Sequence, residues 1–278
     1  MTQGYLCWAV LSLLGQKFFG RFDFSLELET LNIRAPSFDY VGVTGPLGWA
    51  GLDPNANQAC STGSDQSPIN LDNSISTSTT KLHLSIPNVA NAEFENLGTT
   101  VEVVAVEGQL SLGQDQYKLL QFHFHTPSEH RVGKEYFPLE MHMVFQKLPG
   151  NGSGPNLVLG ALFELDRYGF TTSLISSLGK SVRRIASPGS STNTGRLDFT
   201  AVTNLFQTTE LFHYGGSLTT PPCTEGISWL VAKNPLPMDV DTFLAFKNVI
   251  KFNSRYTQNA PGGENLVKVA MEEYPKST

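Results

Sequence analysis

Three histidines occupy alternate positions in two segments that have the pattern of β-strands. His123 and His125 lie in the first segment, and His142 lies in the second. Because successive side chains of a strand point to opposite faces, the first two share a face with Gln121, and His142 shares a face with Glu140. The opposite faces are apolar and carry Leu120, Phe122, Phe124, Leu139, Met141, Met143 and Phe145. If the two segments are neighbours, three imidazoles point at one place.

This arrangement suits a catalytic zinc ion, which usually has three protein ligands and an open fourth position. Ligating histidines also need their second ring nitrogen held by an acceptor, and Gln121 and Glu140 are placed for that role. The alternative is a solvated polar face of a sheet, where His-x-His pairs also occur. The apolar opposite faces, and the gathering of half of the six histidines in one patch, favour the metal site.

The elements that must position these histidines are mostly strands. Short alternating or β-branched runs between turn signals predict strands over 81–86, 99–106, 109–112, 119–125, 139–146 and 157–164. A period of 3.6 residues predicts surface helices over 172–185 and 238–250. The predicted fold is mainly β (α+β in the broad sense), with a large twisted, mostly antiparallel central sheet and a few surface helices.

The composition is that of a folded protein without a nucleic-acid surface. Hydrophobic residues make up 40% and charged residues 16% of the 278 residues, which allows a substantial core. The net charge of -6 comes without a long run of one sign, whereas nucleic acids and anionic membranes need clustered Lys and Arg. No internal repeat or interdomain linker is visible, so one large domain is expected.

The N-terminal part of the chain differs from the rest. An apolar stretch over 5–15 is too short for a transmembrane span and matches the core of a secretory signal, although no Lys or Arg precedes it. A buried helix and a misassigned start are the alternatives. Without this stretch, which contains Cys7, the cysteines number two, Cys60 and Cys223, as suits an oxidising compartment. We predict a signal, presequence or disordered arm over 1–35, secretion or a periplasm-like location, and a glycosylation acceptor at Asn151.

Five blocks of the sequence, taken together, resemble the alpha-class carbonic anhydrases. They are Gln66-Ser-Pro-Ile-Asn70, Gln121-Phe-His-Phe-His125, Ser128-Glu-His130, Glu140-Met-His142 and Ser217-Leu-Thr-Thr-Pro-Pro222. The resemblance runs from about Phe38 to Gln258 and implies a single catalytic domain over 36–278. It also implies a lyase in which zinc-bound hydroxide attacks carbon dioxide reversibly to give bicarbonate and a proton, with ester hydrolysis as a side activity.

The resemblance assigns a role to each matching position. His123, His125 and His142 match the ligands of one catalytic zinc ion, and Gln121 and Glu140 match residues that orient two of these ligands.

Further matches concern the reacting groups and the pocket. Thr219 matches the threonine that accepts a hydrogen bond from the hydroxide, and Glu129 matches the carboxylate that receives the threonine's proton. His130 matches a buried structural histidine, whereas Tyr40 resembles an active-site tyrosine or is a packing aromatic. Thr220 resembles the residue on the bicarbonate side. The apolar wall where carbon dioxide rests in the family is matched by residues that resemble it, Val144, Val158, Leu218 and Trp229.

Three more positions matter for the resemblance. Thr99 stands where the faster members have a proton-shuttle histidine, and threonine cannot titrate near neutral pH. We therefore expect proton transfer to limit turnover and imidazole buffer to accelerate it. Cys60 and Cys223 match a disulfide of secreted members. Anions and sulfonamides are the expected inhibitors, and the sequence predicts no transmembrane span and leaves the oligomeric state open.

Two other functions compete with this interpretation. His123, His125 and Glu129 also fit the spacing of a cupin metal motif, but Tyr136 stands where that motif has a glycine. A non-catalytic binding module is the second alternative, since some relatives lose a zinc ligand. All three histidines, Glu129 and Thr219 are present here, which favours the enzyme.

Overall fold

The computed structural model describes residues 38–104, 107–148 and 157–273. The predicted arm over 1–35 and the glycosylation candidate Asn151 lie outside these residues. Within the described ranges, none of the helices has the length and apolarity needed to cross a bilayer.

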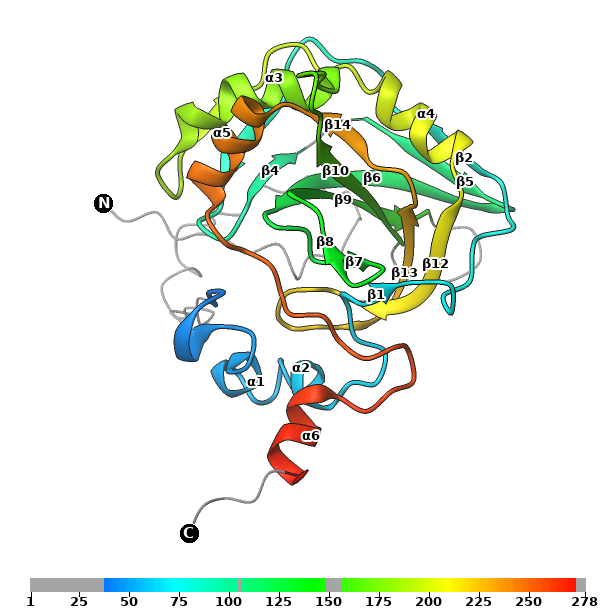
Figure 1. The fold of residues 1–278 in the computed structure, drawn as a ribbon, viewed down its shortest axis with the longest axis vertical. Helices are drawn as coiled ribbons and strands as arrows, with labels where there is room; N and C mark the ends of the chain where they lie inside the picture. Colours follow the sequence, from blue (N-terminus) through cyan, green and yellow to red (C-terminus); the bar gives the residue numbers. More distant parts are fainter. Residues whose placement is uncertain (1–37, 105–106, 149–156, 274–278) are drawn as a thin grey trace, which may run out of the picture.

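A large twisted sheet forms the centre of the structure (Figure 1). Its main path runs β11-β3-β4-β6-β9-β10-β13-β12, with β14 beside β10 and with β5 joining β2 to β6. The bounds are β2 Leu82–Ser85, β3 Glu93–Asn96, β4 Val101–Val104, β5 Gln109–Leu112, β6 Asp115–His125, β9 Leu139–Lys147, β10 Leu157–Leu165, β11 Ser191–Asn193, β12 Leu211–Ser217, β13 Glu225–Ala232 and β14 Leu236–Met238. The predicted mainly β fold with a central sheet is confirmed.

The sheet is mostly antiparallel, as predicted, but two pairings are parallel. Strand β10 pairs antiparallel with β9 on one side and parallel with β13 and β14 on the other. Parallel strands need a long crossover, and residues between β10 and β13 include helices that supply it. The central strand β10 is buried along most of its length, as expected for a strand covered on both faces.

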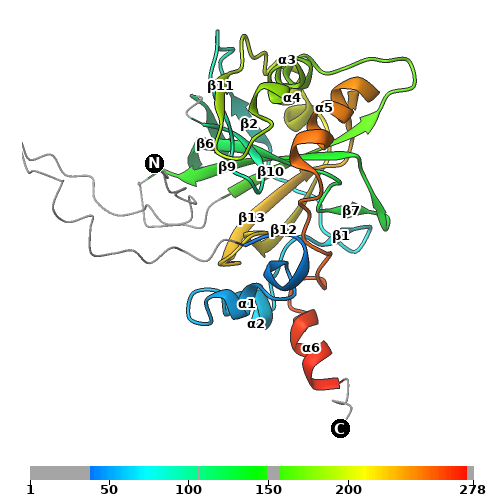
Figure 2. The same cartoon turned by 90° about the vertical axis from the view of Figure 1, so that its left-hand side faces the viewer.

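Three helices cover one face of the sheet, and Figures 1 and 2 show them together above it. They are α3 Ser173–Val182, α4 Thr200–Thr208 and α5 Val240–Ile250. Their apolar stripes pack on the inward side chains of the central strands, including Phe122, Phe124, Met141 and Met143. The main hydrophobic core therefore lies on the face opposite to the three histidines.

Smaller elements close the other face and the lower end of the molecule. A second sheet has the order β1-β7-β8, with bounds β1 Asn70–Leu71, β7 Arg131–Val132 and β8 Glu135–Tyr136. The short helices α1 Trp49–Leu52 and α2 Ala59–Thr62 lie with α6 Leu266–Glu273 below the sheet (Figure 2). Short 3-10 turns occur at Gly42–Thr44 (η1) and Arg183–Ile185 (η2).

Both predicted helices are confirmed, with small changes at their ends. The helix predicted over 172–185 is α3, whose last turn tightens into η2. The helix predicted from Met238 begins at Val240, because Met238 belongs to β14 and Asp239 is the N-cap, accepting a hydrogen bond from the Thr242 amide at 2.8 Å.

The predicted orientation of Leu120 is wrong. The ladder between β6 and β9 shifts register between Leu119 and Gln121, so one extra residue is inserted at this point. Leu119 is consequently buried in the core, whereas Leu120 is only half-buried. Simple alternation places Leu120 on the core face because it does not include such an insertion.

Candidate metal centre and active site

Pairing between β6 and β9 brings the three histidines together. His123 lies directly opposite His142, and His125 lies opposite Glu140, so all four side chains share one face of the sheet. The ring centroids of the histidines are 4.5 to 5.3 Å apart. One nitrogen of each ring lies within 4.8 Å of the corresponding nitrogens of the other two. Three donors therefore converge on a single point.

Two of these rings are oriented by side chains from their own strands. His123 Nδ1 donates to Gln121 Oε1 at 2.8 Å, and His142 Nε2 donates to Glu140 Oε1 at 2.8 Å. An acceptor on one ring nitrogen leaves the other nitrogen unprotonated and directed to the common point. Gln121 and Glu140 thus make the contacts that the sequence predicts for them.

The third ring is oriented by a residue that the sequence analysis does not identify. His125 Nδ1 donates to the backbone carbonyl of Asn253 at 2.8 Å. A backbone acceptor leaves no signature in the side-chain sequence, so spacing alone could not have found it. His125 Nε2 is buried and has no hydrogen-bond partner among the described residues. A buried ring nitrogen without a hydrogen-bond partner is available to bind a ligand such as a metal ion.

The electrostatics of the cluster fit a divalent metal ion. Burial lowers the pKa of all three histidines, and for His125 to about 4. The rings are therefore neutral at pH 7 and offer lone pairs, which metal ligation requires. Three uncharged nitrogen donors of this kind suit a zinc ion.

Glu140 is a buried acceptor at the base of the centre. Burial by itself would raise the pKa of Glu140, but His130 and His142 hold it well below its usual range. Its Oε2 accepts the backbone amides of Glu129 and His130 at 2.8 and 2.9 Å, and its Oε1 also contacts His130 Nδ1 at 2.6 Å. Gly160 faces His142 across the ladder, and a Cβ there would lie 3.3 Å from Glu140 Oε1. A glycine at this position leaves room for the carboxylate.

His130 is held on both sides and is not placed as a ligand. Its Nε2 lies 2.6 Å from the Tyr214 hydroxyl, and that hydroxyl donates to Ser67 Oγ at 2.9 Å. Both ring nitrogens are therefore occupied by protein partners. The second group of possible ligands, formed by His130, Glu140 and His142, is held together by these hydrogen bonds.

Glu129 and Thr219 lie beside the histidine cluster. Glu129 Oε1 accepts the backbone amide of Arg255 at 2.8 Å, and its Oε2 lies 3.5 Å from His125 Nε2 without a hydrogen bond of ordinary geometry. Burial raises the pKa of Glu129 to about 7, while His142, the Arg255 amide and the Thr219 side chain act in the opposite direction. Thr219 is thus near enough for its hydroxyl to donate to this carboxylate.

The four residues predicted to form the apolar wall belong to one hydrophobic cluster, and the Trp229 ring centroid lies 4.7 Å from that of His142. Val158 lies opposite Val144 on one neighbouring strand and opposite Trp229 on the other. Leu218 packs on the same cluster from the segment after β12. Thr220, the residue predicted on the bicarbonate side, is half-buried and follows Thr219.

Thr99 lies in the turn that joins β3 to β4. The Leu97 amide donates to the Thr100 carbonyl at 2.9 Å, and Gly98 has a φ of 84°, which favours glycine. The Asn253 side chain donates to the Thr99 carbonyl at 3.1 Å. The turn is therefore tied to the residue that orients His125, but its own side chains carry no titrating group.

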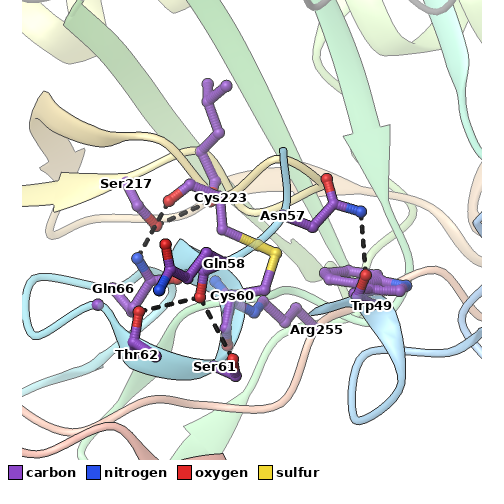
Figure 3. Close-up of a disulfide and its surroundings, with 12 residues drawn as sticks. Trp49, Asn57, Gln58, Cys60, Ser61, Thr62, Gln66, Ser217, Cys223 and Arg255 are labelled. Carbon is purple, nitrogen blue, oxygen red and sulfur yellow. Dashed lines mark hydrogen bonds between the residues drawn. A yellow bond between two sulfur atoms is a disulfide. The ribbon is translucent and has the colours of Figure 1, made fainter. Parts of the chain in front are cut away.

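The predicted disulfide is confirmed: Cys60 and Cys223 are bonded (Figure 3). The bond joins α2 to the loop after Thr219, and the Cys223 amide donates to the Thr220 carbonyl at 2.8 Å. Gln66 donates to the Cys223 carbonyl at 3.1 Å. These contacts anchor the loop that carries Thr219.

Tyr40 packs with aromatic neighbours close to this disulfide. It is buried and makes edge-to-face contacts with Phe38 and Trp49, whose centroids lie 5.9 and 5.7 Å away. Both cysteines belong to the same small hydrophobic cluster. The Tyr40 ring therefore takes part in the packing around the disulfide.

Comparisons with known proteins give the chain a family. The family model for eukaryotic-type carbonic anhydrase matches residues 44–267. A carbonic anhydrase of Neisseria gonorrhoeae is 35% identical over 203 residues, which cover 70% of this chain and 73% of that protein. The alpha carbonic anhydrase of Aspergillus oryzae is 42% identical with a TM-score of 0.80, covering 86% of this chain and 100% of its own.

A further solved structure is that of an alpha-carbonic anhydrase from Thermovibrio ammonificans in complex with the inhibitor sulfanilamide. It is 31% identical with a TM-score of 0.67, covering 81% of this chain and 96% of the other. These matches decide against the cupin-type alternative, which belongs to a different fold. The chain belongs to the eukaryotic-type, or alpha-class, carbonic anhydrase family.

Proposed function

We propose that His123, His125 and His142 hold the zinc ion with which this carbonic anhydrase hydrates carbon dioxide to bicarbonate and a proton. The observation that carries the proposal is the convergence of three nitrogens while the other nitrogen of each ring is bound to an acceptor. When bound, zinc supplies a Lewis acid that lowers the pKa of water to about 7, so that hydroxide is available at neutral pH.

Thr219 and Glu129 orient the nucleophile in this proposal. The Thr219 hydroxyl donates its proton to the Glu129 carboxylate, so the threonine oxygen can only accept a further hydrogen bond. The nucleophile must then direct its own hydrogen toward Thr219 and its lone pair away from it. The fixed acceptor costs no reorganisation during the reaction.

The apolar cluster supplies the place for carbon dioxide. No side chain of Val144, Val158 or Leu218 has a hydrogen-bonding group. The ring nitrogen of Trp229 already donates to the Ser217 carbonyl at 3.0 Å. A wall of this kind holds a nonpolar molecule without hydrating it. Thr220 lies on the polar side, where the charged product leaves.

The direct test combines metal analysis with a hydration assay. We expect about one zinc per chain by metal analysis, loss of carbon dioxide hydration on chelation, and recovery with zinc. The variant His142→Ala should lose both zinc and activity, whereas His83→Ala, an exposed histidine on β2, should keep both. Zinc bound at full stoichiometry without hydration would instead support the non-catalytic module.

Inhibitor binding gives an independent check of the same centre. Sulfanilamide is bound by the relative from Thermovibrio ammonificans. We expect the zinc-loaded chain to bind it and the chelated protein to lose this affinity, as measured by calorimetry. Equal affinity with and without zinc would contradict the proposed centre.

The proposed location is an oxidising compartment outside the cytosol. The Cys60–Cys223 bond supports it, because disulfides persist where thiols are not kept reduced. Cleavage of a signal within 1–35 and glycosylation at Asn151 are further proposals. Intact mass of the secreted protein, before and after glycosidase treatment, tests both.

A further inference from the structure

A row of side chains crosses the sheet from an edge strand to the histidine cluster. In the ladders, Ser191 lies opposite Glu95, Glu95 opposite Glu102, and Glu102 opposite His123, which in turn lies opposite His142. Residues directly opposite each other on paired strands point to the same face. Two carboxylates therefore stand in line between the exposed edge strand β11 and the metal centre.

The inner carboxylate is buried with an open acceptor. Glu102 is 3% exposed, and its Oε1 has no hydrogen-bond partner among the described residues. Its strand neighbours Val101 and Val103 point into the main core on the other face. A buried oxygen that no protein donor satisfies takes up a water molecule, and here that water would lie beside the histidines.

The outer carboxylate connects this interior to solvent. Glu95 is half-buried, and its cross-strand neighbour Ser191 is exposed. Adjacent strands are roughly 4.8 Å apart, which puts the Glu95 backbone about 10 Å from that of His123. Two or three water molecules can bridge a gap of this size.

The charged side chains that act on Glu95 within the sheet are Glu93 on the same strand and Glu102 across the ladder. Burial and then Glu93 on the same strand raise the pKa of Glu95. Strand β11 brings the uncharged Ser191 opposite Glu95. Neither carboxylate has an ion pair with a basic group among the described residues. This surrounding favours proton uptake at pH values where an ordinary glutamate is ionised.

The same hairpin carries the turn with Thr99, which offers no titrating side chain. We propose that Glu95 is the residue that accepts the proton released by hydration, and that Glu102 positions the water between Glu95 and the metal centre. This inference rests on the proposed function. The proton moves along water to a carboxylate oxygen of Glu95, giving the neutral acid, and then passes to a buffer base at the rim; the reverse reaction returns it.

Steady-state kinetics at low buffer concentration give the first test. We expect Glu95→Gln to lower kcat by about tenfold, which is less than the ~10²–10⁴-fold effect of a general acid or base because water and buffer can still carry the proton. The ratio kcat/KM, which reports the interconversion before proton export, should stay near the wild-type value. Imidazole buffer should restore the kcat of Glu95→Gln. The double variant Glu95→Gln with Thr99→His should also recover kcat. Glu135→Gln, an exposed carboxylate on β8, is the matched control and should not change kcat.

Two further measurements test the proposal without relying only on the kinetics of Glu95→Gln. In the zinc-loaded protein, the carboxyl carbon of Glu95, assigned by its absence in Glu95→Gln, should titrate by NMR clearly above about 4.3. Glu102→Gln keeps an acceptor oxygen and should retain most of kcat, whereas Glu102→Leu should lower it as Glu95→Gln does.

The possible outcomes distinguish a failure of the Glu95 proposal from a failure of the proposed function. If Glu95→Gln hydrates carbon dioxide as fast as the wild type at low buffer, or if Glu95 titrates like an ordinary exposed glutamate, Glu95 is not the acceptor. If the wild type itself binds no zinc and hydrates no carbon dioxide at any buffer concentration, the proposed centre is at fault instead.

Discussion

At the scale of single residues, the proposed ligands are oriented by residues that hydrogen-bond to their second ring nitrogen. Asn253 shows this most clearly, because its carbonyl orients His125 while its side chain holds three backbone groups: it accepts the Thr126 amide and donates to the carbonyls of Phe124 and Thr99. The sequence predicts the histidines because their spacing has a meaning on a strand. It does not predict Asn253, which acts from 128 residues away through its main chain.

Replacing Asn253 by alanine should destabilise the protein. The change leaves a buried amide and two carbonyls without their partner, and an unsatisfied buried group costs about 1–3 kcal/mol. Urea unfolding of the metal-free protein should show a loss in this range or somewhat above it. Asn193→Ala, at an exposed site on β11, is the control and should change little. Equal midpoints for both variants would contradict this role of Asn253.

Glu140→Gln should weaken zinc binding more than it changes the fold. The amide of glutamine has one acceptor oxygen, whereas the carboxylate of Glu140 serves two amides and two rings. Loss of such an outer contact typically reduces metal affinity by about 10–100-fold. Competition with a zinc chelator measures this affinity directly. An unchanged affinity, with Glu135→Gln as reference, would show that Glu140 does not act on the ligand His142.

At the scale of elements, the sequence predicts the strands that alternate clearly and misses those that do not. Strands β9 and β10 match their predicted ranges closely, whereas β6 begins at Asp115, four residues before its predicted start. Strand β12 is missed because it contains Gly215 and Gly216, and glycine has a low propensity for the interior of a strand. The structure requires glycine at 216, since a Cβ would lie 2.7 Å from the Tyr214 ring and would overlap Ser67 Oγ. The parallel partner of β10 is missed with β13, since pairing partners are set by tertiary packing.

The disulfide is an element-scale tether for the loop that carries Thr219. Its closure spans 163 residues, and the loop-entropy relation gives a contribution of about 5 kcal/mol as an upper range. The double variant Cys60→Ala with Cys223→Ala should therefore unfold at clearly lower denaturant and turn over more slowly. Reducing agent should mimic it in the wild type and should not affect the double variant. If reduction leaves both stability and kcat unchanged, the tether has no such role.

At the scale of the molecule, one face of the sheet carries the hydrophobic core and the other face carries the candidate site. Helices α3, α4 and α5 bury the face with the aromatic core, which fixes β6 and β9 in register. The other face can then hold uncharged histidines and unsatisfied carboxylates that would be unfavourable in a less constrained site. Stability is thereby coupled to the protonation of the site, and its pH dependence reports this coupling.

The metal-free protein should be most stable near pH 6.5. The pKa values of His123, His125 and His142 are lowered by burial, so below about 6.5 the unfolded chain binds more protons and stability rises with pH. Burial raises the pKa of Glu129 to about 7 and of Glu102 to about 8. For these two, the folded state binds more protons from the unfolded pKa of about 4.3 upward, so their contribution falls with pH.

Burial and Glu93 also raise the pKa of Glu95, but by less, so its falling contribution lies close to the unfolded pKa. The three histidines therefore outweigh the glutamates below about pH 6.5, and Glu102 and Glu129 continue to lower the stability above it. Urea unfolding of chelated protein at pH 5, 6.5 and 8 measures the three free energies of unfolding, and the middle value should be the highest. Glu102→Gln removes one of the two falling contributions, so its stability should decline less between pH 6.5 and 8. A wild-type stability that still increases up to pH 8 would mean that Glu102 and Glu129 are ionised in the folded protein at neutral pH.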